Sequence, residues 1–154
     1  MPYYKDIHTL FIHIPKTGGT TLEKVLRQEG NNKQSLYSGY TNKLLPEPYN
    51  KISLQHQFYQ TILENKNLCN IDFDEELKLL TIVRNPYHRA VSSLFFYNQI
   101  QTTTPPPKVF EALRKFIEKS CDQTDNHNVP QYEFITDKNG KLPNKLIVLK
   151  TESL

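Results

Sequence analysis

Residues 10–26, LFIHIPKTGGTTLEKVL, place an apolar run, a glycine-rich turn and a helical pattern directly after one another. The apolar run at 10–14 has no helical period, which favours a strand buried on both faces of a parallel sheet. Gly18 and Gly19 allow a tight turn in which several backbone N–H groups can converge on one anion. The helix N-terminus and the Lys16 ammonium add positive charge, so the segment predicts a loop that binds phosphate or sulfate. An ordinary strand–helix turn with a solvated lysine is the alternative.

The order of the residues in this loop excludes the common nucleotide-binding signatures. The P-loop of ATP- and GTP-binding proteins is G-x-x-x-x-G-K-[ST], with the lysine after the glycines, whereas Lys16 precedes Gly18. The dinucleotide signature G-x-G-x-x-G is also absent from the sequence. A kinase with an irregular P-loop therefore remains only a minor alternative. Thr20 and Glu23 have the spacing of a capping box, which predicts that the helix begins at this point.

A second motif at residues 79–97, LLTIVRNPYHRAVSSLFFY, repeats the pattern of strand, turn and helix. Asn85 is a suitable N-cap, and Pro86 suits the first helical position, where a missing N–H costs nothing. Arg84 lies at the carboxyl end of the predicted strand, and Ser92 follows about two helical turns later. A guanidinium and a hydroxyl at this spacing could converge on a second phosphate. The simpler alternative is a salt bridge at Arg84 and a tolerated helix serine.

Together these motifs resemble those of the sulfotransferases that use 3′-phosphoadenosine 5′-phosphosulfate. FIHIPKTGGTT resembles the 5′-phosphosulfate loop of that family and VRNPYHRAVSS its 3′-phosphate motif, and the likeness is closest to the carbohydrate sulfotransferases of the heparan and chondroitin type and their soluble bacterial or viral relatives. The resemblance implies an α/β, P-loop-like three-layer fold with a central, mainly parallel sheet flanked by helices. It assigns the 3′-phosphate to Arg84 and Ser92. The residues that it assigns to the 5′-phosphosulfate are Lys16, Thr17, Gly18, Gly19, Thr20 and Thr21.

The resemblance also implies a reaction and two catalytic residues. A sulfuryl group would pass in line from the donor to an acceptor hydroxyl, with a carbohydrate as the expected acceptor and 3′,5′-adenosine bisphosphate as the product. Lys16 would stabilise the leaving oxygen, and His56, in SLQHQFYQTIL, would be the general base. The competing interpretation of His56 is a surface histidine at the start of a helix. The family needs no metal, and the sequence has no zinc-ligand spacing.

Composition and length bound the partners and the compartment. The formal net charge is +3 without a dense Lys/Arg run, which suits an anionic ligand and disfavours nucleic acid. Cys69 and Cys121 form no disulfide framework, and no signal peptide or membrane span is recognisable, so a soluble, cytoplasmic protein is the default expectation. Residues 1–154 are expected to form a single domain. Because the family continues beyond the final KTESL, a non-catalytic nucleotide-binding remnant is the main alternative function.

Weaker patterns predict the remaining elements. Residues 109–117 have the period of an amphipathic helix, which follows a stiff proline-rich connector at 102–107. Residues 132–135 and 145–149 are predicted as strands around a turn at 137–140. Phe95, Phe96 and Tyr97 are interpreted as helix core rather than pocket residues. The acceptor has no signature of its own in the sequence.

Overall fold

The sheet of this protein is mixed, with a parallel central part. The computed structural model describes residues 1–28, 34–36, 42–118 and 126–154. The sheet has the order β3-β1-β2-β4-β5. Its strands are β1 (Tyr3–Tyr4), β2 (Thr9–Ile12), β3 (Gln34–Ser35), β4 (Lys78–Val83) and β5 (Leu146–Lys150). The longer strands β2, β4 and β5 run parallel, and the two short strands add antiparallel pairs at one edge. The predicted mainly parallel sheet is therefore confirmed.

The register of the parallel strands brings the two predicted motifs to the same edge of the sheet. Ile12 pairs with Thr81, so the loop that follows β2 and the Arg84 residue that follows β4 emerge side by side. The β4–β5 pairing continues to Val83 and Lys150. Carboxyl ends of parallel strands are where ligands bind in open α/β sheets. The topology thus creates one site from two distant parts of the chain.

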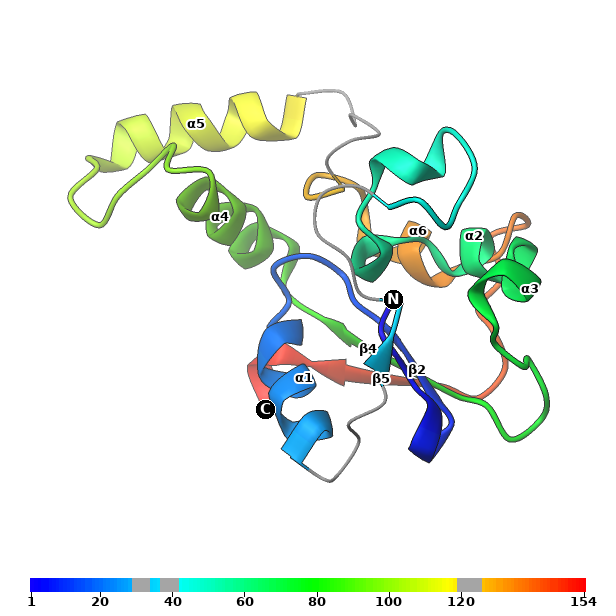
Figure 1. Cartoon of the computed structure of the whole chain (residues 1–154). Helices are drawn as coiled ribbons and strands as arrows, with labels where there is room; N and C mark the ends of the chain where they lie inside the picture. The colour runs from blue at the N-terminus through cyan, green and yellow to red at the C-terminus, as the bar shows by residue number, and fades with distance from the viewer. Residues whose placement is uncertain (29–33, 37–41, 119–125) are drawn as a thin grey trace.

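Helices cover both faces of the sheet, which makes the three expected layers (Figure 1). On one face, α1 (Gly19–Gln28) packs Leu22 and Leu26 against a core that contains Phe11 and Ile82. The other face is covered by α2 (Tyr59–Glu64), α3 (Lys66–Cys69) and α6 (Gln131–Ile135). Alternate residues of β2 point to the two cores, as expected for a strand buried on both faces.

Two helices form an arm that projects from the sheet (Figure 1). They are α4 (Pro86–Phe96) and α5 (Pro106–Glu118), joined by a small core of their own around Leu94 and Phe116. Asn85 is the N-cap of α4, since its side chain accepts from two backbone N–H groups, and Pro86 is its first residue; both predictions are confirmed. None of the described helices is long and apolar enough to span a membrane.

The strand predicted at 132–135 is wrong, because these residues form α6. Pro130 lies immediately before this helix, and Phe134 and Ile135 are its buried residues. A segment this short carries too little periodicity to separate a strand from one helical turn, so packing against the sheet decides its conformation.

The single-turn 3₁₀ helices are η1 (Lys5–Ile7), η2 (Tyr49–Lys51), η3 (Leu54–His56) and η4 (Thr151–Ser153).

The core around Ile82 should dominate the stability of the sheet. Ile82 has no exposed surface, whereas 45% of Val148 in the edge strand is exposed. We expect Ile82→Ala to lower the free energy of unfolding by about 2–5 kcal/mol, because the substitution removes buried methyl groups and leaves a cavity. The control Val148→Ala should cost less than about 1 kcal/mol. Equilibrium unfolding in urea measures both, and equal losses would contradict this assignment of the core.

Candidate active site

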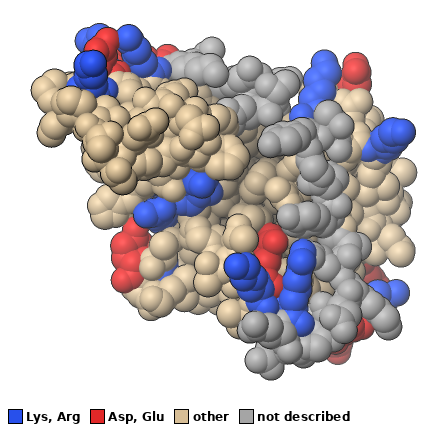
Figure 2. All heavy atoms as spheres, turned by 60° about the vertical axis from the view of Figure 1, so that its left-hand side comes forward, with Lys and Arg blue, Asp and Glu red and all other residues tan. Residues whose placement is uncertain are grey.

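A pocket of about 350 Å³ lies at the carboxyl edge of β2 and β4. It is bounded by the glycine loop, α4, η3 and the segment that follows residue 126. Figure 2 shows basic side chains in a recess beneath the projecting helices. The sequence-predicted residues that line the pocket are Lys16, Gly18, Gly19, Thr20, His56, Arg84 and Ser92. The structure also contributes lining residues that the motifs did not indicate, namely His13, Pro15, Glu23, Gln55, Phe96 and His127.

Two of the predicted donor-binding threonines do not line the pocket. Thr17 is fully buried, and its hydroxyl donates to the carbonyl of Ile14 at 2.9 Å. Thr21 is exposed on α1, and its backbone N–H donates to the carbonyl of Gly18 at 3.0 Å. The hydroxyl of Thr17 and the amide of Thr21 therefore stabilise the loop and the first turn of the helix.

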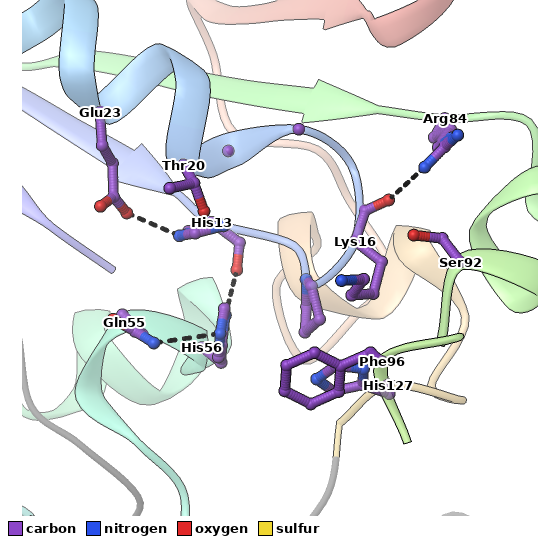
Figure 3. Close-up of a pocket in the computed structure, with 13 residues that line it drawn as sticks. His13, Lys16, Thr20, Glu23, Gln55, His56, Arg84, Ser92, Phe96 and His127 are labelled. Carbon is purple, nitrogen blue, oxygen red and sulfur yellow. Dashed lines mark hydrogen bonds and ion pairs between the residues drawn. The ribbon is translucent and has the colours of Figure 1, made fainter. Parts of the chain in front are cut away.

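The glycine loop and the end of β4 bring two cations, Lys16 and Arg84, to one side of the pocket (Figure 3). Lys16 has a φ of 65°, and its carbonyl accepts from Arg84 Nη1 at 3.3 Å. The Lys16 ammonium lies 4.6 Å from the centroid of the Phe96 ring, a cation–π distance. Burial, and secondly the neighbouring Arg84 charge, lower the pKa of Lys16. Because like charges repel in a partly desolvated pocket, this pair favours an anionic ligand between them.

Gly19 is required by the packing of the protein itself. A Cβ atom added at Gly19 would lie 2.2 Å from Cδ2 and Nε2 of His13, far inside van der Waals contact. Gly18 has a φ of +89°, which L side chains rarely adopt. The two glycines therefore serve different purposes: Gly18 turns the chain, and Gly19 makes room for an imidazole.

His13 is the group that fills this space. It is 6% exposed, and its Nδ1 lies 2.7 Å from Oε1 of Glu23, which is 5% exposed. Its ring also stacks on Phe11 and meets the edge of His56, with centroids 5.2 Å and 4.7 Å apart. The predicted capping box of Thr20 and Glu23 is wrong. The helix α1 already begins at Gly19, and the Glu23 carboxylate pairs with His13 instead of capping the helix.

His56 lies across the pocket from the glycine loop, at the end of η3 (Figure 3). Its Nδ1 is 3.0 Å from the carbonyl oxygen of His13, which can only accept, so Nδ1 carries the proton and Nε2 keeps its lone pair. The Gln55 amide nitrogen lies 3.3 Å from this Nε2. Burial, followed by the charge of His13, holds the pKa of His56 well below its ordinary value. The ring is thus a neutral imidazole with its proton on Nδ1.

An aromatic wall closes the pocket on the side of α4. Phe96 and His127 stack with ring centroids 5.0 Å apart, and Tyr97 lies 5.0 Å from His127. Phe96 is 51% exposed, so its interpretation as helix core is wrong. The sequence signal for this wall was the aromatic end of the second motif, at residues 95–97.

The turn that follows β5 connects the glycine loop to the end of β4. The Thr151 hydroxyl lies 2.6 Å from the carbonyl oxygen of Thr17 and 3.0 Å from that of Val83. Glu152 accepts from the backbone N–H of Asn85 at 2.7 Å. Backbone amides at the start of α4 are therefore already bonded to Asn85 and Glu152, which leaves the Arg84 and Ser92 side chains as the polar groups of this motif that line the pocket.

This combination of parallel sheet, glycine loop and cation pair defines an α/β protein with a pocket suited to an anionic ligand at the carboxyl edge of its sheet. Residues 3–144 match the model of the Sulfotransferase family, and the chain belongs to this family. No curated protein and no solved structure matches the chain significantly. The match to the family model confirms the resemblance to the sulfotransferases, and the protein is a transferase of sulfuryl groups. Among the residues that the structure describes, no cluster of three or more His, Cys, Asp or Glu could hold a metal ion.

The contact between His13 and Gly19 can be tested with a double-mutant cycle. Gly19→Ala should be strongly destabilising, because the new Cβ overlaps the imidazole of His13. In a His13→Ala background, where the imidazole is absent, the same substitution should cost at least about 1 kcal/mol less. Thermal and urea unfolding of the four proteins give the coupling. Equal costs in both backgrounds would show that the loop needs Gly19 for another reason.

Proposed function

We propose that this protein transfers a sulfuryl group from 3′-phosphoadenosine 5′-phosphosulfate to an acceptor hydroxyl, that of a carbohydrate, by in-line displacement with His56 as the general base. The observation that carries the proposal is one pocket with the anion-binding groups on one side and a neutral imidazole of defined tautomer on the other. Family membership supports sulfuryl transfer in general. The donor, the acceptor class and the base are the proposal.

The donor side matches a nucleotide that carries anionic groups at both ends. Lys16 and the loop glycines would bind the 5′-phosphosulfate, with the N-terminus of α1 behind them. Arg84 and Ser92 line the same pocket and would bind the 3′-phosphate. Arg84 provides a planar fork that suits two phosphate oxygens, and a serine hydroxyl adds a further donor.

The chemical step then follows from the positions of charge and proton. The acceptor oxygen attacks sulfur, the bond from sulfur to the bridging phosphate oxygen breaks, and the acceptor proton moves to Nε2 of His56. Negative charge grows on the leaving oxygen, where the Lys16 ammonium would stabilise it. The products are the sulfated acceptor and 3′,5′-adenosine bisphosphate. Because Nδ1 of His56 is held by the carbonyl of His13, the incoming proton has one ring nitrogen to occupy.

The acceptor side suits the mixed character of a sugar. The half-exposed Phe96 side chain offers apolar surface for the C–H side of a sugar ring, and the polar side chains of the same pocket surround it. No carboxylate other than Glu23, which pairs with His13, lines the pocket in the part of the chain that the structure describes. An acidic glycan would therefore meet little repulsion here.

Donor binding can be tested without knowledge of the acceptor. Isothermal titration calorimetry should show binding of 3′,5′-adenosine bisphosphate that is tighter than binding of ATP with Mg²⁺. Lys16→Met and Arg84→Met should each weaken it about 10- to 100-fold, since each removes a charged contact to a phosphate. Lys24→Met, which changes an exposed lysine of α1 outside the pocket, should leave the affinity within about twofold. A wild-type protein that binds only ATP would support the kinase alternative instead.

The role of His56 can be tested by transfer of labelled sulfate to a panel of glycans. His56→Asn should keep bisphosphate affinity and lower turnover by roughly 10²- to 10⁴-fold. Because the pKa of His56 lies well below 6.5, the base stays neutral as the pH falls past that value, and the acid limb of kcat/KM should appear below pH 6.5. Full turnover in His56→Asn would contradict the assignment, and bisphosphate binding without transfer to any acceptor would support a binding-only protein.

A further inference from the structure

Arg89 is a buried cation close to the pocket. It lies in α4 within the second motif, is 6% exposed and does not line the pocket. A buried guanidinium is costly unless its N–H groups are well hydrogen-bonded, so the partners of Arg89 show which parts of the molecule it holds together.

The guanidinium of Arg89 donates to three backbone carbonyl groups in two segments that are far apart in the sequence. Nε donates to Pro15 at 2.9 Å, Nη1 to Val129 at 2.7 Å and Nη2 to Asn126 at 3.2 Å. Pro15 is the residue immediately before Lys16, in the donor loop. Asn126 and Val129 flank His127, which belongs to the acceptor side of the pocket.

A second hydrogen bond extends this connection to the proposed base. The side-chain amide of Asn126, which is 4% exposed, donates to the carbonyl of His56 at 2.8 Å. His56 in turn donates from Nδ1 to the carbonyl of His13, at the start of the donor loop. A closed path of hydrogen bonds and backbone therefore surrounds the pocket. It passes through Arg89, Asn126, His56 and His13 and returns to Arg89 at Pro15.

We propose that Arg89 is a positioning residue, which holds the donor loop at Pro15 and the acceptor-side segment at Asn126 and Val129 in a fixed mutual position. This inference rests on the proposed function, because that function assigns the donor to one side of the pocket and the acceptor to the other. In-line transfer requires the acceptor oxygen, sulfur and leaving oxygen to be aligned, and small displacements of one side are costly. Arg89 acts through the segments that it holds and does not touch the substrates.

Lysine cannot replace Arg89 in this arrangement, although it keeps the charge. The planar guanidinium presents its N–H donors in fixed directions, toward Pro15 on one side and the two carbonyls of the acceptor segment on the other. An ammonium on a flexible chain lacks this geometry. Arg89→Lys is therefore the informative variant, and Arg114→Lys, at an exposed position of α5, is its matched control.

Two measurements read the two sides of the pocket separately. Calorimetry with 3′,5′-adenosine bisphosphate reads the donor loop. Nitrogen-15 NMR of the histidine rings as a function of pH reports the Nδ1–H tautomer and the titration of His56, on the other side. The charged or titratable neighbours of His56 are His13, His127 and the N-terminal amine. Arg89→Lys should weaken the bisphosphate about tenfold, reduce the preference of His56 for the Nδ1–H tautomer and raise its pKa toward the ordinary value. Arg114→Lys should change neither readout.

Asn126→Ala tests the acceptor side alone and without any change of charge. It removes the donor to the His56 carbonyl but keeps the carbonyl that accepts from Arg89. We expect the same change in the His56 ring and a bisphosphate affinity within about threefold of wild type. If Arg89→Lys fails to fold, as judged by thermal unfolding, Asn126→Ala decides: an unchanged His56 ring overturns the proposal.

The outcomes also separate this inference from the proposed function. If the wild type binds no bisphosphate, the proposed donor is wrong, whereas the His56 signals of the free protein still report on Arg89. If a folded Arg89→Lys keeps both the bisphosphate affinity and the His56 tautomer of the wild type, the positioning role is overturned even though the donor assignment stands.

Discussion

The architecture of the pocket depends on one buried imidazole, that of His13. Its ring occupies the space that a side chain at Gly19 would need. The ring also pairs with Glu23, which lies in α1 like Gly19, and it lies against the His56 ring. Its backbone carbonyl fixes the tautomer of His56. The conformation of the glycine loop, the start of α1 and the chemistry of the proposed base therefore share a single support. Because the surroundings are close-packed, a shift of this ring would displace all three together.

The parts of the fold that the sequence predicted well are those governed by local rules. The strands β2 and β4, the cap at Asn85 and the start of α4 at Pro86 follow from apolar runs and capping preferences within a few residues. The helix α6 was missed, because five residues carry no decisive period and Phe134 is placed by the core that it enters. The pairing of Glu23 with His13 was also missed. The local sequence favours a capping role for Glu23, and the ion pair forms only when the folded core brings His13 next to it.

The candidate site divides in the same way. Lys16, Arg84 and Ser92 lie within recognisable motifs, and the register of β2 and β4 brings them into one pocket. Phe96 ends the second motif, whereas Gln55 and His127 lie outside both motifs. The three side chains meet only through the tertiary structure. Arg89 belongs to the second motif and was still missed, because its importance lies in three carbonyl groups that any residue could present. Backbone partners leave no trace in the sequence.

The contact of Thr151 with the glycine loop has a consequence for the biosynthesis of the protein. The carbonyl of Thr17 and the hydroxyl of Thr151 are separated by 134 positions. Synthesis proceeds from the N-terminus, so the loop is made early but acquires this hydrogen bond only after residue 151 has left the ribosome. Until then, a nascent chain would carry a glycine loop that lacks this support.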